Sequence, residues 1–347
     1  MHRKSARIVA ACLLSGAAAL STAALRAQDP APAAPRWSVP RTPWGDPDLQ
    51  GMWPGTESLG IPLQRDPKLG TRALLTEEEF QARARDAQRQ LDAMNEEFDL
   101  ETADTSNAGQ VGSATSPPPH WQERGKPSRQ ASLIVDPPDG RMPPLTPAAQ
   151  ARQAALDAAR RGRGPADSYL DRSLYDRCLT RGVTGSILPV IYNNGNEIVQ
   201  APGYVVIRNE MIHEARIVPL DRRPHLSGAI RQWMGDSRGH WEGDTLVVET
   251  TNLTDRTGVN QGGGFRHTEA ATLVERFTLT GPDMLQYQVT IDDPQTWTRP
   301  WTIAFPWKRD SSYLLFEYSC HEGNYAMRNL LSGARADERT AQRPQGR

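Results

Sequence analysis

The C-terminal half of the chain alternates short apolar runs with turn residues. Each run is rich in Val, Ile, Thr and aromatic residues, which favour pleated strands with one buried face. The clearest predicted strands are Thr245–Leu253, Ala271–Thr280, Met284–Asp292, Trp301–Trp307 and Tyr313–Cys320. Tight turns separate them and helical crossovers do not, so the sequence predicts an antiparallel sheet.

Shorter strands are predicted upstream, from about Leu174. They pair as Ile187–Ile191 with Glu197–Gln200, Tyr204–Ile207 with Met211–Leu220, and Arg231–Gly235 with Trp241–Leu253. A long up-and-down series usually closes into a barrel or splits into a sandwich, because open sheet edges invite aggregation. We therefore expect a mainly β fold, an antiparallel β-barrel over residues 171–335 that resembles the lipocalin and calycin group in architecture only. A disordered tail, 336–347, is expected to follow.

Helical patterns precede this block. Thr76 with Glu79 forms a capping box, which predicts a helix over Thr76–Phe98. Thr146-Pro147 starts a second predicted helix that ends near Arg161. We interpret residues 44–170 as an N-terminal arm and a helical cover.

Two features of this region leave alternatives open. Trp44 and Trp53 of the arm either enter the barrel or pack on its outside. The arginines at the end of the second helix, Arg160, Arg161 and Arg163, either complement the helix dipole or form an anion site.

The first residues have the pattern of a secretory signal peptide. A basic start is followed by the apolar run Ile8–Leu20, which is too short to span a bilayer, and then by small residues. We predict a signal peptide over residues 1–27 and a Pro/Ala-rich linker over 28–43. The mature protein is expected in the periplasm or outside the cell, with no membrane insertion after cleavage.

The net charge and the cysteine content limit which partners the protein binds and indicate the compartment in which it folds. The formal net charge is -1, so we expect no nucleic-acid partner. Without the signal peptide two cysteines remain, Cys178 and Cys320. In an oxidising compartment two thiols usually pair, which predicts a disulfide. The alternatives are two buried thiols or one reactive thiol.

Several segments resemble a large set of exported bacterial proteins that are usually classed as hypothetical. These segments are Trp44–Gly51, Ile134–Leu145, Tyr192–Gln200, Arg231–Asp244 and Tyr318–Asn324. The resemblance covers most of the mature chain. It implies export and a shared fold, and it implies no activity.

Alternation along the strands places polar groups on apolar faces. Glu275 is the acid on one such face, Tyr287 lies on a second, and His213 is expected on a third. Tyr318 lies on the last predicted strand, and His321 and Glu322 follow it at the predicted mouth of the barrel interior. Because burial raises a carboxyl pKa, Glu275 is the predicted general acid or base, His213 its proton partner, and a tyrosine the ligand-orienting group.

Two alternatives compete with this site. In the first, Glu275 pairs with a buried arginine and His213 donates to a backbone carbonyl, so that both are structural. The second alternative is a two-His-one-carboxylate metal site, formed by His213, His321 and either Glu275 or Glu322. No ligand spacing supports that metal site, and there is no Gly-x-Ser-x-Gly elbow or phosphate-cradling glycine loop. We therefore predict no metal and no cofactor.

Tryptophans form the remaining candidate cluster. Trp233, Trp241, Trp297 and Trp301 are predicted to line a ligand cavity. The alternative is a Trp-rich core. The sequence thus predicts an enzyme that applies acid–base chemistry to a small apolar or cyclic ligand, as a lyase, isomerase or hydrolase. The alternative function is non-catalytic ligand binding.

Overall fold

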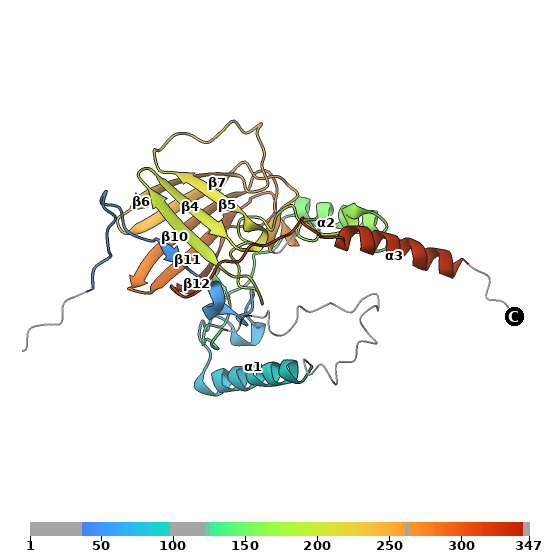
Figure 1. The fold of residues 1–347 in the computed structure, drawn as a ribbon, viewed down its shortest axis with the longest axis horizontal. Coiled ribbons are helices and arrows are strands. Elements are labelled where there is room, and N and C mark those ends of the chain that lie inside the picture. Colours follow the sequence, from blue (N-terminus) through green and yellow to red (C-terminus); the bar gives the residue numbers. More distant parts are fainter. Residues whose placement is uncertain (1–36, 98–122, 124, 261–263, 343–347) are drawn as a thin grey trace, which may run out of the picture. The chain divides into compact units, whose positions relative to one another are not determined.

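The computed structural model describes residues 37–97, 123, 125–260 and 264–342. The chain divides into two compact units, Met1–Ser38 and Val39–Arg347. The first unit, which contains the predicted signal peptide, lies almost wholly outside the described residues. The second unit is strand-rich, and its described residues form two main antiparallel sheets and three α-helices (Figure 1).

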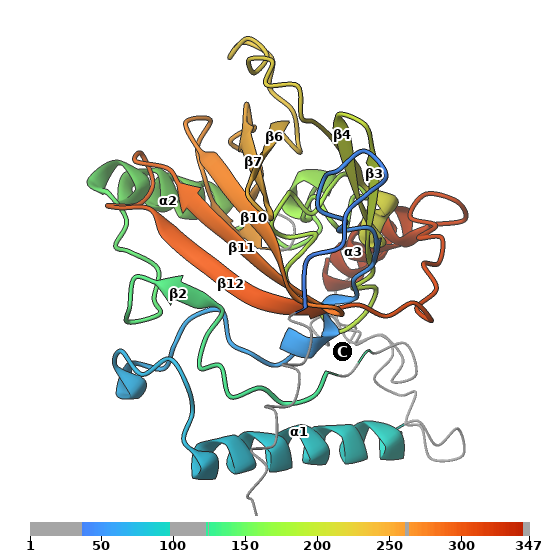
Figure 2. The same ribbon diagram turned by 90° about the vertical axis from the view of Figure 1, so that its left-hand side faces the viewer.

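The larger sheet has six strands in the order β2-β12-β11-β10-β7-β6, and all neighbours are antiparallel. Figure 2 shows its central strands side by side. The strands are β2 (Ile134–Asp136), β6 (Asp236–Glu242), β7 (Thr245–Thr251), β10 (Thr272–Gly281), β11 (Met284–Asp292) and β12 (Trp301–Lys308). The long predicted strands of the C-terminal half therefore form this sheet, apart from the last one.

The smaller sheet has four strands in the order β1-β3-β4-β5. They are β1 (Gly51–Met52), β3 (Asn196–Ala201), β4 (Tyr204–Asn209) and β5 (Ala215–Pro219). A separate hairpin pairs β8 (Gly258–Asn260) with β9 (Gly264–Arg266). Short 3-10 turns cover Gly55–Ser58, Pro67–Leu69, Tyr169–Asp171 and Met211–His213.

The predicted antiparallel β fold is confirmed, but the described strands form no closed barrel. The two sheets approach each other through side chains at β5 and β6. A Cβ on Gly239 would lie only 2.8 Å from Val218 Cγ1, so the glycine lets the sheets come close there. The described backbone makes no ladder between these two strands.

Three predicted strands do not form. Ile187–Ile191, Arg231–Gly235 and Tyr313–Cys320 have no strand backbone. The last segment alternates correctly, yet Phe316 is 67% exposed and its N–H donates to the carboxylate of Glu210. Alternation predicts a strand only where a neighbouring strand accepts the hydrogen bonds.

The helices are α1 (Glu77–Glu97), α2 (Pro147–Arg160) and α3 (Ala326–Ala341). The capping box of α1 is present, because Thr76 N donates to Glu79 and Glu79 N donates to Thr76 Oγ1. Helix α3 was not predicted, and it occupies part of the expected disordered tail. Its Ala- and Arg-rich sequence has good helix propensity. No helix among the described residues is long and apolar enough to cross a membrane.

Aromatic side chains fill the space against the inner face of the larger sheet. The largest fully buried side chains include Trp53, Phe277, Tyr287, Trp301, Phe305 and Trp307. Tyr287 stacks on Trp307 with ring centroids 5.2 Å apart. Trp53 of the arm belongs to this core, whereas Trp44 is exposed, so the arm contributes one of its two tryptophans to the interior.

The predicted disulfide is confirmed. Cys178 and Cys320 are bonded, with Cα atoms 5.7 Å apart and a sequence separation of 142. Both cysteines lie in segments without strand or helix. The bond therefore ties two loops together, and it is typical of an oxidising, extracytoplasmic compartment.

We expect the Cys178→Ser/Cys320→Ser double variant to unfold at lower denaturant concentration than the wild type. On the chain-entropy model a disulfide that closes a loop of this length stabilises the folded protein by up to about 5 kcal/mol. Guanidinium unfolding measures the loss, and a reducing agent should shift the wild type towards the variant without affecting the variant itself. Two free thiols in the denatured, unreduced protein would contradict the bond.

Candidate functional site

Glu275 lies in a buried ion pair. Its carboxylate accepts two hydrogen bonds from the Arg216 guanidinium, and the bond from Nη2 to Oε1 is 2.8 Å long. It accepts a third hydrogen bond, of 3.0 Å, from the Tyr287 hydroxyl. The side chains of Arg216 and Glu275 are 3% and 0% exposed. The negative charge of Glu275 holds the pKa of Arg216 above its ordinary value against the opposing effect of burial. It also adds to burial in raising the pKa of Tyr287.

The backbone before β5 explains why arginine, and not histidine, meets Glu275. Ile212 and His213 both have positive φ, 59° and 43°, which interrupts the expected strand. Consequently Arg216 points inward, and Ile217 is 65% exposed. The predicted apolar face that included His213 is therefore wrong by one residue of register.

His213 does not contact Glu275. It is exposed, and its Nδ1 lies 2.9 Å from the carbonyl oxygen of Tyr318. His321 and Glu322 are also exposed. The described part of the chain contains no group of three or more His, Cys, Asp or Glu side chains placed to hold a metal ion, so the two-His-one-carboxylate set is not assembled there.

The predicted tryptophans divide between core and cavities. Trp301 is fully buried and packs edge-on against Trp297, with centroids 5.3 Å apart. Trp241 packs against the core. Trp297 and Trp233 each line a separate cavity. Since aromatic rings fill the interior beside the larger sheet, the space for a ligand lies in these cavities.

The larger cavity, of about 1310 Å³, lies beside α2 and the segment that follows β9. Its apolar wall includes Met142, Leu145, Leu156 and Trp297. Its charged lining residues are Arg152, Arg231, Asp255, Arg266 and Glu269. A cavity with one apolar wall and a few fixed polar groups is typical of a small-molecule site.

Hydrogen bonds fix the polar floor of this cavity. Asp293 is buried and accepts from Thr268 N at 2.6 Å, Thr268 Oγ1 at 2.8 Å and Thr296 Oγ1 at 2.6 Å. His267 is buried between Thr257 Oγ1, 3.1 Å from Nε2, and the Thr268 carbonyl, 3.2 Å from Nδ1. Burial lowers the pKa of His267. This imidazole therefore favours the neutral form, with Nδ1–H donating to the carbonyl.

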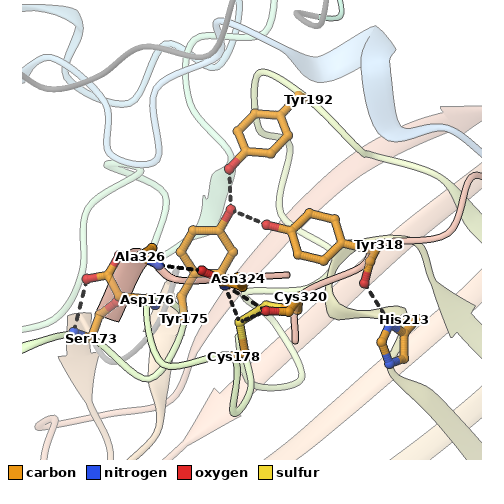
Figure 3. The surroundings of a disulfide bond; sticks show 10 residues. All are labelled: Ser173, Tyr175, Asp176, Cys178, Tyr192, His213, Tyr318, Cys320, Asn324 and Ala326. Atoms are coloured by element: carbon orange, nitrogen blue, oxygen red, sulfur yellow. Dashed lines mark hydrogen bonds between the residues drawn. A yellow bond between two sulfur atoms is a disulfide. The ribbon is translucent and has the colours of Figure 1, made fainter. Parts of the chain in front are cut away.

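A second polar cluster surrounds the disulfide (Figure 3). The Tyr175 hydroxyl is hydrogen-bonded to those of Tyr192 and Tyr318, the latter at 2.8 Å. Arg181 is buried, with its guanidinium carbon 5.1 Å from the Tyr175 ring centroid. Of these residues the sequence singled out only Tyr318, because the others come from segments with no strand alternation.

Glu214 lies at the edge of this cluster. Its carboxylate accepts hydrogen bonds from Thr180 Oγ1 at 2.7 Å and Ser186 Oγ at 3.3 Å. Burial raises the pKa of Glu214, while these hydrogen bonds and the charge of Arg216 oppose the rise. Glu214 directly follows His213 in the sequence, so strand alternation places it on the opposite face and gives no reason to select it.

A scan against models of protein families finds no match, and a search of curated proteins finds none either.

Breaking the buried ion pair should destabilise the fold. We expect Glu275→Gln to lower the free energy of unfolding by about 3–5 kcal/mol, because it leaves the Arg216 charge buried without its counter-charge. The control is Arg216→Met/Glu275→Leu, which removes both charges and should lose much less. Urea unfolding measures both. A Glu275→Gln protein of wild-type stability would restore the catalytic interpretation of this carboxylate.

Proposed function

We propose that the protein binds a small organic anion with an apolar ring in the cavity beside α2, without transforming it. One observation carries the proposal: an apolar wall that includes Met142, Leu145 and Leu156 lines the same cavity as three arginines. The apolar wall suits burial of a ring, and guanidinium groups suit carboxylate or sulfonate oxygens.

The arginines of this lining have different roles. Arg152 donates to Gln295 O and Thr296 Oγ1, both at 3.0 Å. Arg231 donates to Glu269 O at 3.0 Å. Arg266 forms no ion pair with a described carboxylate. The first two thus brace the wall, and Arg266 supplies the charge available to a ligand.

We expect the mature protein to bind 1-anilinonaphthalene-8-sulfonate saturably, since this probe joins an aromatic body to an anionic group. Ala155→Trp should weaken binding at least about tenfold, equivalent to about 1.4 kcal/mol, because Ala155 is an exposed lining residue and the indole fills the cavity. Ala158→Trp is the matched control, being exposed on α2 and outside the lining. Fluorescence titration measures both variants. Equal affinities would reject the cavity as the site.

Acid–base catalysis remains a second candidate, and we assign it to Glu214 in place of Glu275. The observation that favours it is a half-buried carboxyl with a raised pKa next to Thr180 and Ser186. Arg181 and three tyrosine hydroxyls lie nearby. A raised carboxyl pKa favours general acid–base work, because it brings the pKa closer to the operating pH.

The raised pKa of Glu214 has a measurable consequence. Between the unfolded and the folded pKa the native state binds more protons, so this group's contribution to stability falls as pH rises through that window. Glu214→Gln removes the titration. The wild-type free energy of unfolding minus that of the variant should therefore fall with increasing pH above about 4.5. Urea unfolding at several pH values tests this, and a pH-independent difference would contradict it.

We further propose a periplasmic or secreted location and a partly open, calycin-like barrel. The disulfide supports export. The ion pair between β5 and β10, together with the close approach at Gly239, supports two sheets that curve around one interior.

A further inference from the structure

A second cleft, of about 810 Å³, has an unusual concentration of positive charge. Six arginines line it, with Asp171 as the acidic residue of the lining. Six positive charges minus one give a formal charge of +5 in this lining, whereas the whole chain has a formal net charge of -1. The arginines are Arg160, Arg163, Arg172, Arg177, Arg256 and Arg266.

Two of the six arginines are neutralised locally. Arg163 makes a two-pronged ion pair with Asp171, with Nε–Oδ1 at 2.8 Å and Nη2–Oδ2 at 2.6 Å. Arg172 lies 3.3 Å from Asp176. The other four form no ion pair with a carboxylate of the described residues. Of these four, Arg177 lies over the Tyr169 ring, with Cζ 5.0 Å from the centroid.

The unpaired arginines repel one another. Partial burial lowers the pKa of Arg266, and the charges of Arg160 and Arg256 lower it further, whereas the charge of Asp255 opposes this effect. These three come from separate segments, namely the end of α2, the turn before β8, and β9. Bringing like charges together costs free energy unless an anion compensates them. The cleft therefore has an excess of positive charge that a bound anion would compensate.

We propose that this arginine cleft binds a diphosphate group, either free or carried by a small organic molecule. Guanidinium forks match the paired oxygens of phosphoryl groups better than ammonium groups do, and the lining contains arginine and no lysine. Four uncompensated arginines suit an anion with several charges, and the cleft is larger than a single phosphate requires. Trp233 also lines it, which places an aromatic side chain next to an attached base or sugar. The site is separate from the cavity beside α2, although Arg266 contributes to both.

The test uses calorimetric titration of the mature chain with inorganic pyrophosphate at low ionic strength. We expect one binding site, with orthophosphate at least about tenfold weaker. Arg160→Gln/Arg256→Gln should weaken pyrophosphate at least about tenfold, since hydrogen bonds to charged groups contribute about 1.5–3 kcal/mol. The matched control is Arg85→Gln/Arg339→Gln, which removes the same charge from exposed positions on α1 and α3 and should leave the affinity unchanged.

Further measurements distinguish guanidinium recognition from charge alone, an organic diphosphate from the free ion, and this cleft from the cavity beside α2. Arg160→Lys/Arg256→Lys keeps the charge and should still lose affinity, because the forks are gone. Adenosine diphosphate that binds more tightly than pyrophosphate indicates an organic diphosphate, and equal affinity indicates the free ion. Anilinonaphthalene sulfonate binding should be unchanged in the Arg160→Gln/Arg256→Gln variant, so the two sites fail independently. Absence of pyrophosphate binding, or equal losses in the cleft and control variants, would overturn the proposal.

Discussion

The pairing of Arg216 with Glu275 is the constraint on which the interior depends. Arg216 comes from β5 of the smaller sheet and Glu275 from β10 of the larger one. An unpaired charge at either position would cost several kcal/mol. The pair therefore fixes how these strands face each other, and the Tyr287 hydroxyl supplies a third polar contact. Around it the interior is apolar and aromatic.

Because this interior is filled by side chains, the candidate ligand-binding sites lie outside it. Stacked and edge-on aromatic rings occupy the space beside the larger sheet, so a ligand has to bind where loops and α2 meet the ends of the strands. Both cavities lie there, and both draw residues from distant parts of the sequence. Loops held by a rigid sheet are a common location for binding residues.

The two cavities differ in chemistry. The larger one has an apolar wall and polar lining residues, Thr268 and Thr296, which donate hydrogen bonds to the buried Asp293. The smaller one is dominated by guanidinium groups. Arg266 belongs to both linings.

Local patterns in the sequence determined the elements whose signals are themselves local. Period-2 alternation located β10, β11 and β12, and the capping box located the start of α1. Two cysteines behind a predicted signal peptide favoured the disulfide that the structure contains. Tertiary structure alone decided what each polar group contacts. The positive φ of Ile212 and His213 moved β5 by one residue of register, so Arg216 became the partner of Glu275. The arginine cleft likewise joins segments about a hundred residues apart, because electrostatic compensation depends on distance in space, which spacing along the chain does not record.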